Sequence, residues 1–193
     1  PYCVKKCAYC DFVSIPSAPR AAEMEDYAAA LTAELLREVP PLRARRGAAA
    51  TIYVGGGTPT ALPAPLLMGV LETLRTAAGT PVEWTVEANP GTVDTAYLGA
   101  LRAAGANRLS LGVQSFDDTL LYGIGRIHTA AEAAQAFHAA RAAGFENISI
   151  DLMYGLPGQA LADLKDSVAR AAALGIGHIS IYGVAVEDGT PFA

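Results

Sequence analysis

Three cysteines, Cys3, Cys7 and Cys10, stand within the first ten residues of this 193-residue chain and are its only cysteines. An odd number of cysteines packed this closely cannot form the disulfides that would stabilise a domain of this size. Three thiolates on one short loop can each bind one corner of an iron–sulfur cubane and leave the fourth iron free for another ligand. The C-x3-C-x2-C spacing therefore predicts metal ligands and favours an iron–sulfur cluster.

Other interpretations of the cysteine triplet stay open at this point. A structural zinc site takes four protein ligands, and His128, His138 or His178 would have to supply the fourth. An adventitious thiol cluster or a redox-active pair would also fit the spacing. We expect His128 to have a structural role, and His138 and His178 to occupy packing or surface positions.

A second group of polar or small residues stands where apolar segments end. The group comprises Gly56, Gly57, Thr58, Glu87, Gln114 and Asp151. The three residues at 56–58 follow one apolar run, and Glu87, Gln114 and Asp151 stand at the ends of the next three runs along the chain. If these runs are parallel strands, their carboxyl ends carry the candidate binding residues.

The segments that must position these residues alternate between two patterns. Apolar, β-rich runs alternate with alanine-rich helical stretches, and Gly, Pro or Asn marks each switch. The pattern predicts strands at residues 51–54, 82–87, 108–113, 148–152 and 178–182. It predicts helices at residues 23–39, 66–78, 95–104, 130–143 and 161–174, with a weaker helix before residue 130. Pro40 and Pro41 are expected to end the first helix.

This alternation predicts the α/β class, with a parallel sheet covered by helices. A doubly wound open sheet and a (β/α) barrel both fit five apolar strands separated by helices. Both architectures gather their sites at the carboxyl ends of the strands. A barrel brings the candidate residues to one mouth, whereas an open sheet spreads them along an edge.

Composition and charge exclude several classes of protein. The chain is 52% hydrophobic and 17% charged, which excludes a disordered segment. Its net charge of −5 argues against nucleic-acid binding. The most apolar stretch, residues 171–186, is too short and too interrupted to span a bilayer, and no signal sequence opens the chain. We therefore expect a soluble, cytoplasmic protein.

The ends of the chain suggest that it is part of a longer protein. It begins with Pro1 and not with methionine, and it ends at Ala193, shortly after the last predicted strand. A targeting segment before Pro1 would not be visible in this sequence.

The cysteine motif, together with the glycine run that follows the first predicted strand, resembles the radical S-adenosylmethionine (SAM) superfamily. More narrowly, the chain is similar to the oxygen-independent coproporphyrinogen III oxidase group and the related HemW-type haem chaperones. The similar segments cover nearly the whole chain: PYC at 1–3, CDF at 10–12, YVGGGTPT at 53–60, EANP at 87–90, SLGVQSF at 110–116 and DLMYGLPG at 151–158.

The resemblance implies a partial TIM-like barrel of six βα units, with its first strand missing from this chain. Residues 1–193 would form the radical SAM core domain, and a C-terminal domain would lie outside the sequence. Cys3, Cys7 and Cys10 would ligate a [4Fe–4S] cluster. SAM would bind the open iron, and an electron from the reduced cluster would cleave it to methionine and a 5′-deoxyadenosyl radical. An electron donor such as flavodoxin or ferredoxin is therefore an implied partner.

The resemblance also implies the residues that bind SAM, namely Tyr9, Gly56, Gly57, Thr58, Glu87, Gln114, Arg126, Asp151 and Ala185. Glu87 and Asp151 would accept hydrogen bonds from an ammonium group or from ribose hydroxyls, since an unpaired carboxylate ending an apolar strand is costly. The guanidinium of Arg126 would bind the methionine carboxylate through its fork. Tyr9 and Ala185 would contact adenine. Taken singly, these residues also fit a tight turn, a capping acid or a solvated arginine.

One position separates the two related groups. The oxidases carry an additional cysteine two residues after the triplet, where this chain has Phe12. The sequence Cys10-Asp11-Phe12 resembles the chaperones, which predicts the radical SAM core of a HemW-like haem chaperone. Haem would bind to the full-length protein and pass to an acceptor protein. SAM cleavage is expected to be retained. The alternatives are a coproporphyrinogen III oxidase, which removes two propionate carboxyls as CO2, and a non-enzymatic zinc-binding module.

Overall fold

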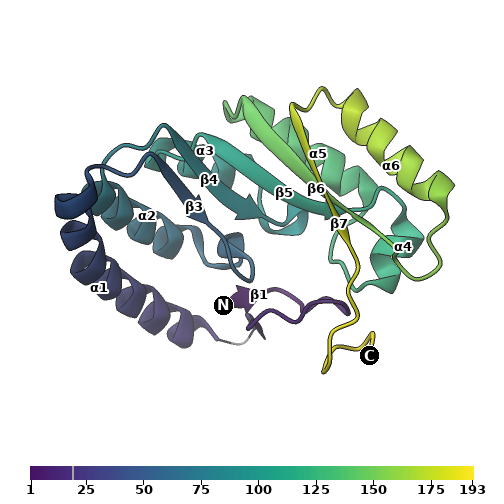
Figure 1. Ribbon diagram of the computed structural model, residues 1–193, viewed down its shortest axis with the longest axis horizontal. Helices are drawn as coiled ribbons and strands as arrows, with labels where there is room; N and C mark the ends of the chain where they lie inside the picture. Colours follow the sequence, from purple (N-terminus) through teal and green to yellow (C-terminus); the bar gives the residue numbers. More distant parts are fainter. Residues whose placement is uncertain (19) are drawn as a thin grey trace.

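Five parallel strands form the central sheet in a computed structural model, which describes residues 1–18 and 20–193. The strands are β3 (Thr51–Val54), β4 (Glu83–Ala88), β5 (Arg108–Gln114), β6 (Asn147–Tyr154) and β7 (His178–Gly183). Figure 1 shows them side by side in the order β3-β4-β5-β6-β7, and each neighbouring pair is parallel. The five predicted strands are confirmed, with ends that differ from the prediction by no more than two residues.

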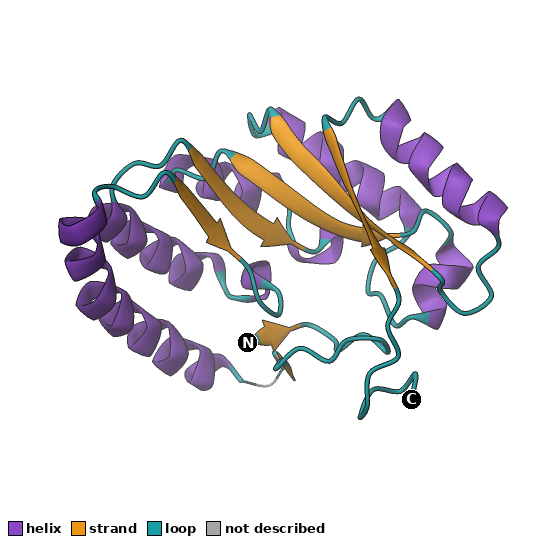
Figure 2. Cartoon of the chain, viewed as in Figure 1, coloured by secondary structure: helices purple, strands orange, loops and turns teal. Residues whose placement is uncertain are grey.

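The order of the strands decides between the two predicted architectures. A doubly wound sheet reverses its strand order at a switch point, whereas this order follows the sequence without reversal. Right-handed crossovers then place all helices on the same face of the sheet. Figure 2 shows the helices along the outer side of the curved sheet and the N-terminal segment on its open side. The fold is therefore a partial TIM-like barrel, and the doubly wound alternative is wrong.

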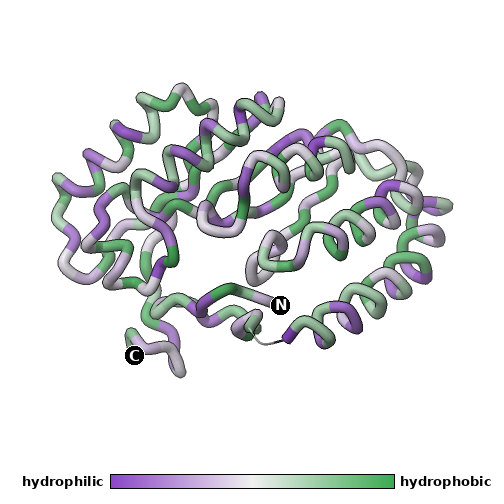
Figure 3. Tube along the Cα trace, turned by 180° about the vertical axis from the view of Figure 1, so that it is seen from behind, coloured by the Kyte–Doolittle hydropathy of each residue, from purple (hydrophilic) through white to green (hydrophobic). Residues whose placement is uncertain are grey.

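Among the described residues, six α-helices lie on the outer side of the sheet. They are α1 (Ala21–Arg46), α2 (Ala64–Ala78), α3 (Thr95–Ala104), α4 (Asp118–Gly123), α5 (Ala130–Ala142) and α6 (Leu161–Ala173), with short 3-10 turns at η1 (Pro59–Ala61) and η2 (Pro90–Thr92). Seen from behind in Figure 3, hydrophobic and hydrophilic positions alternate along these helices. Most of the hydrophobic positions pack with the sheet in the main core, where Trp84 is buried, while Leu120 of α4 belongs to a second, smaller cluster. No helix within the described residues is long and apolar enough to cross a membrane.

The first helix differs from the prediction at its C-terminal end. The helix continues through Pro40 and Pro41 as far as Arg46. Proline removes a backbone donor but has a helical φ angle, so a helix that gains tertiary contacts further on can continue past it. Those contacts come from α2, where Arg43 Nη1 donates to the carbonyl of Thr76 at 3.3 Å. Packing between α1 and α2 therefore overrides the local stop signal.

Two short strands that the sequence did not predict hold the cysteine segment. Strands β1 (Tyr2–Cys3) and β2 (Ile15–Pro16) pair in parallel and close the cysteine segment into a loop. The hydroxyl of Tyr2 donates to the carbonyl of Glu23 on α1 at 3.0 Å, and the Thr58 amide after β3 donates to the Tyr2 carbonyl at 2.7 Å. These contacts fix the loop over the carboxyl ends of the strands.

Candidate functional site

A cavity of about 410 Å³ is lined by the cysteine loop and the carboxyl ends of the strands. All twelve predicted site residues line it: Cys3, Cys7, Cys10, Tyr9, Gly56, Gly57, Thr58, Glu87, Gln114, Arg126, Asp151 and Ala185. These residues come from segments that lie far apart in the sequence, from Cys3 to Ala185. The fold therefore brings the predicted cysteine, carboxylate and arginine side chains together at one site.

The three thiols are free, and the loop that carries them is held at several points. Cys7 is buried, and Cys3 and Cys10 are partly exposed. The amide of Cys10 donates to the Cys7 carbonyl at 3.2 Å, which makes the tight turn between these two residues. The amide of Ala8 donates to the carbonyl of Ile124 at 3.0 Å and ties the loop to the segment after α4.

The arrangement of the thiols bears on the kind of metal group they could hold. Within residues 1–18 and 20–193, no three His, Cys, Asp or Glu side chains converge as ligands of a single metal ion. A structural zinc ion needs such convergence, whereas each corner of a cubane cluster is bound by its own thiolate. Neither His138 on α5 nor His178 at the start of β7 lines the cavity. The three thiols that line the cavity are therefore the candidate ligands for a metal group at this site.

Glu87 is held near the end of β4 by contacts from β3 and from the glycine loop that follows it. Its Oε1 accepts a hydrogen bond from the hydroxyl of Tyr53 at 2.8 Å, and its Oε2 lies 3.3 Å from the amide of Gly56. A Cβ atom at Gly55 would lie 2.8 Å from Oε2, so a side chain there would displace the carboxylate. Burial, followed by the hydrogen bond to Glu87, raises the pKa of Tyr53. No local pattern in the sequence pairs Tyr53 with this carboxylate, which lies 34 residues further along the chain.

The glycine run also approaches the cysteine loop closely. A Cβ atom at Gly57 would lie 2.8 Å from the carbonyl oxygen of Tyr2 and 3.3 Å from Cys3 Sγ. The neighbouring Thr58 hydroxyl lies 3.4 Å from the same sulfur. Glycine at position 57 is therefore required for the loop after β3 to pack against the first cysteine.

Asp151 faces the cavity from β6. Its Oδ2 accepts a hydrogen bond from the Ser110 hydroxyl at 2.9 Å. Burial raises the pKa of Asp151, and the nearby hydroxyls of Ser110 and Ser180 oppose this shift. The expectation that Asp151 ends its strand is wrong, since β6 continues to Tyr154. The strand is longer because its last residues pair with β7, through Met153 opposite Tyr182.

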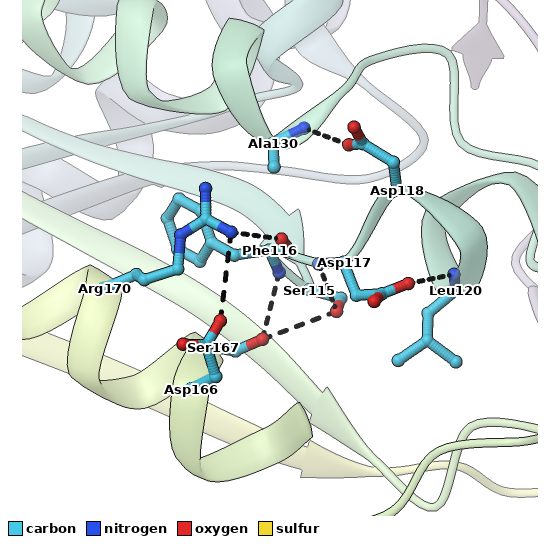
Figure 4. A network of polar contacts seen from close by, with 9 residues as sticks. All are labelled: Ser115, Phe116, Asp117, Asp118, Leu120, Ala130, Asp166, Ser167 and Arg170. Atoms are coloured by element: carbon cyan, nitrogen blue, oxygen red, sulfur yellow. Dashed lines mark hydrogen bonds and ion pairs between the residues drawn. The ribbon is translucent and has the colours of Figure 1, made fainter. Parts of the chain in front are cut away.

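Gln114 ends β5 in a strained conformation. Its φ angle is 72°, in the left-handed region that residues other than glycine rarely adopt, and the register between β5 and β6 shifts at this point. The segment after Gln114 is fixed from α6, as Figure 4 shows. Arg170 Nη1 donates to the carbonyl of Phe116 at 2.7 Å, and the Phe116 amide donates to the hydroxyl of Ser167 at 3.0 Å. These contacts hold the backbone at the end of β5 in place.

Arg126 connects β5 with the cysteine loop. Its Nη2 donates to the carbonyl of Gly112, and its Nη1 lies 3.4 Å from Cys7 Sγ. The third nitrogen, Nε, is buried and has no hydrogen-bond partner. The guanidinium is thus positioned beside the thiols with part of its donor capacity unused.

Unpartnered polar atoms concentrate at this cavity. Among the described residues, the buried side-chain atoms without a partner are Ser14 Oγ, Trp84 Nε1, Arg126 Nε and Asp151 Oδ1. Three of the four residues line the cavity, and only Trp84 lies in the core. Since leaving such a group unpaired costs about 1–3 kcal/mol, native proteins usually pair them. The cavity is therefore suited to a ligand that offers both donors and acceptors.

His128 joins the ends of β4 and β5 behind the cavity. The residue is 4% exposed, its Nε2 donates to the Val113 carbonyl at 3.1 Å, and its Nδ1 lies 3.0 Å from Asn89 Oδ1. Burial lowers the pKa of His128 to about 4, and the positive charge of Arg126 contributes to the shift. The position agrees with the structural role expected from the sequence.

The lowered pKa of His128 predicts a pH dependence of stability. The unfolded state, with an ordinary histidine pKa of 6.5, binds the proton more readily than the folded state, whose pKa is about 4. The stabilisation is therefore complete above pH 6.5 and is lost as the pH falls towards 4. We expect the free energy of unfolding, measured in urea at several pH values in this range, to change less steeply with pH in His128→Gln, because glutamine does not titrate. The same pH dependence of the free energy of unfolding in both proteins would contradict a lowered pKa of His128.

Comparison with known proteins agrees with this geometry. The model of the radical SAM superfamily matches residues 1–171. The haem chaperone HemW of Bacillus subtilis is 40% identical over 202 aligned positions, which cover 100% of this chain and 50% of that protein. HemW of Escherichia coli is 37% identical over 194 positions, again covering 100% of this chain and 50% of the relative. The chain thus spans about half the length of these curated relatives.

Solved structures share the fold. The structure of coproporphyrinogen III oxidase (HemN) from Escherichia coli, described as a radical SAM enzyme, superposes with a TM-score of 0.84 at 29% identity and covers 96% of this chain and 42% of that one. Streptococcus suis SuiB bound to SAM has the same fold, with a TM-score of 0.69 at 16% identity over 98% of this chain and 40% of that one. Membership of this superfamily implies a [4Fe–4S] cluster and SAM. From the match over residues 1–171, together with the arrangement of its cavity, the chain belongs to the radical SAM superfamily.

Proposed function

We propose that this chain is the cofactor-binding core of a HemW-like haem chaperone. The observation that carries the proposal is Phe12, which lies on the cavity wall where the related oxidases have an additional cysteine. The chaperones with 37–40% identity to the whole chain support the same group. In this proposal, the intact protein binds haem and delivers it to an acceptor protein.

Cys3, Cys7 and Cys10 are the proposed ligands of the [4Fe–4S] cluster. They line one cavity, and the Gly57 backbone passes close enough to Cys3 to exclude a side chain. When bound and reduced, the cluster supplies the electron that cleaves SAM to methionine and a 5′-deoxyadenosyl radical. The protein holds the three thiols on one short loop and leaves one iron without a protein ligand.

The remaining predicted residues would bind SAM. The carboxylate of Glu87 is oriented by the Tyr53 hydroxyl and the Gly56 amide, and would accept from the SAM ammonium group. The free Oδ1 of Asp151 would accept from a ribose hydroxyl, and Arg126 would bind the carboxylate. The other proposed contacts come from Tyr9, Gly57, Thr58, Gln114 and Ala185.

The extent of the core and its partners follow from the same proposal. We assign residues 1–193 to one radical SAM core domain, because β7 continues the sheet beyond the matched residues 1–171 and Ala185 lines the cavity. Haem or a related porphyrin would be the cargo. A flavodoxin or ferredoxin would supply the electron, and the cytoplasm is the proposed location.

An assay on the intact protein separates this function from coproporphyrinogen oxidation. After anaerobic reconstitution, the protein is incubated with coproporphyrinogen III, SAM and dithionite, and the products are analysed by mass spectrometry. We expect no vinyl-containing product, slow uncoupled SAM cleavage, and haem binding in a separate spectroscopic titration. Cys7→Ser, tested in parallel, should lose SAM cleavage and so show that it depends on the cluster.

Coproporphyrinogen III oxidase is the second candidate, because the fold superposes on that enzyme with a TM-score of 0.84. Formation of vinyl-containing product would overturn the chaperone proposal in favour of the oxidase. Failure of the intact protein to bind haem would also contradict the chaperone proposal, even without turnover.

A further inference from the structure

Ser14 is a buried residue at the cavity that neither the sequence motifs nor the proposed SAM contacts involve. It lies four residues after Cys10, is 7% exposed and lines the same cavity as the three thiols. Its hydroxyl is one of the buried side-chain atoms of the described residues without a hydrogen-bond partner. A polar atom in this position points to a partner that binds in the cavity.

The backbone on both sides of Ser14 is firmly held. The Ser14 amide donates to the Phe12 carbonyl at 2.7 Å, and the Ile15 amide donates to the Pro1 carbonyl at 2.9 Å. Ile15 also pairs with Tyr2 in the short parallel ladder between β1 and β2. The inward position of Ser14 is thus fixed by its neighbours along the chain.

Around Ser14, the apolar side chains are exposed and the polar side chain is buried, which is the reverse of what hydrophobicity alone predicts. Val13 is 94% exposed and Phe12 is 60% exposed, while the hydroxyl of the neighbouring Ser14 is buried. Burying an apolar side chain and exposing a serine would have been favourable for folding, since an unpaired buried hydroxyl is destabilising. Local rules are often broken in this way where a residue serves function.

The chemistry of the cavity indicates the acceptor. A [4Fe–4S] cluster bound by Cys3, Cys7 and Cys10 would present thiolate and sulfide sulfur atoms, which accept hydrogen bonds and donate none. Ser14 belongs to the same loop as these ligands. We propose that the Ser14 hydroxyl donates a hydrogen bond to a sulfur atom of the cluster, an inference that rests on the proposed cluster site.

Such a bond would raise the reduction potential of the cluster. The reduced cluster carries one more negative charge than the oxidised cluster, so a donor stabilises the reduced form more strongly. The Ser14 side chain therefore acts as a positioning and tuning group, and it is not a metal ligand.

Ser14→Ala tests the inference first in the cluster-free protein. Because this substitution removes an unpaired buried hydroxyl, the folding equilibrium constant of the intact apoprotein should rise about fivefold or more in urea unfolding. Ser167→Ala is the matched control, since the buried Ser167 hydroxyl accepts from the Phe116 amide. Ser167→Ala should lower the folding equilibrium constant, because it leaves the Phe116 amide without its acceptor. A less stable Ser14→Ala apoprotein would show that the hydroxyl has a protein partner and would overturn the inference.

The second measurement is the midpoint potential of the reconstituted cluster, followed by EPR spectroscopy in the intact protein. With equal iron content, Ser14→Ala should have a more negative potential than the wild type, and Ser14→Thr, which keeps the hydroxyl, should lie nearer to the wild type. An unchanged potential in Ser14→Ala overturns the role of Ser14 alone. Weaker SAM binding with an unchanged potential would assign the hydroxyl to SAM and likewise overturn it. Absence of any cluster in the wild type would contradict the proposed function itself.

Discussion

Replacing Cys7 with serine is expected to remove most of the iron from the anaerobically reconstituted protein. Cys7 is the most buried of the three cysteines, and its sulfur lies 3.4 Å from the guanidinium of Arg126. With only three cysteines in the chain, no spare thiol can take its place. Iron and sulfide per chain should fall to a small fraction of the wild-type values, and the brown colour should disappear.

The wild-type protein gives the complementary result in air. An iron site without a protein ligand exposes the cluster to oxidants, so the colour should fade on exposure to oxygen. Val4→Ala is a suitable control, because Val4 is an exposed residue of the same loop that does not line the cavity. It should retain its iron. Full iron content in Cys7→Ser would exclude the cysteine triplet as the cluster site, and bound zinc in place of iron would favour the zinc-binding module.

The strands of this fold could be predicted from sequence because each is a short apolar run between turn-forming residues. The apolar runs at residues 108–113 and 148–152 indicate strands in this way, but they do not indicate the order of the strands in the sheet. Periodicity describes which side of a segment is apolar and contains no information about its neighbours. The choice between a barrel and an open sheet therefore depends on which strands pair with each other, and only the structure shows this.

The errors in the prediction have tertiary causes. Pro40 and Pro41 fail to end α1 because the helix beyond them packs on α2. The paired strands β1 and β2 have two residues each, which is too short for any periodic signal. Both features depend on contacts between segments that are distant in the sequence, and a local sequence pattern does not predict such contacts.

The candidate site likewise combines residues that local motifs predict with contacts that only the fold reveals. Its main residues could be identified because they belong to motifs, such as the cysteine triplet and the carboxylate Glu87. Their supporting contacts could not, since Tyr53 lies 34 residues before Glu87 and Ser110 lies 41 residues before Asp151. For Ser110, alternation along β5 offered one signal, because a serine facing inwards from an apolar strand requires a polar partner. Ser14 stands in no recognised motif, and only its burial identifies it.

Arg126→Ala is expected to weaken SAM binding by at least tenfold in the cluster-loaded protein. The Arg126 guanidinium is oriented by the carbonyl of Gly112 and by Cys7, and its Nε is buried without a partner. Removing one partner of a well-desolvated ion pair costs about 3–5 kcal/mol, whereas a tenfold loss of affinity needs only about 1.4 kcal/mol. Calorimetric titration with SAM under anaerobic conditions measures the change directly.

Two further variants decide whether the effect comes from the geometry of the guanidinium. Arg126→Lys keeps the positive charge but loses the planar fork, so its affinity should lie between those of Arg126→Ala and the wild type. Arg45→Ala changes an exposed residue on α1, outside the residues that line the cavity, and should bind SAM as the wild type does. Since Arg126 is not a cluster ligand, all variants should hold equal iron, which separates lost SAM binding from lost cluster. Equal SAM affinity in Arg126→Ala and the wild type would remove Arg126 from the binding site, and its contacts with Gly112 and Cys7 would then be purely structural.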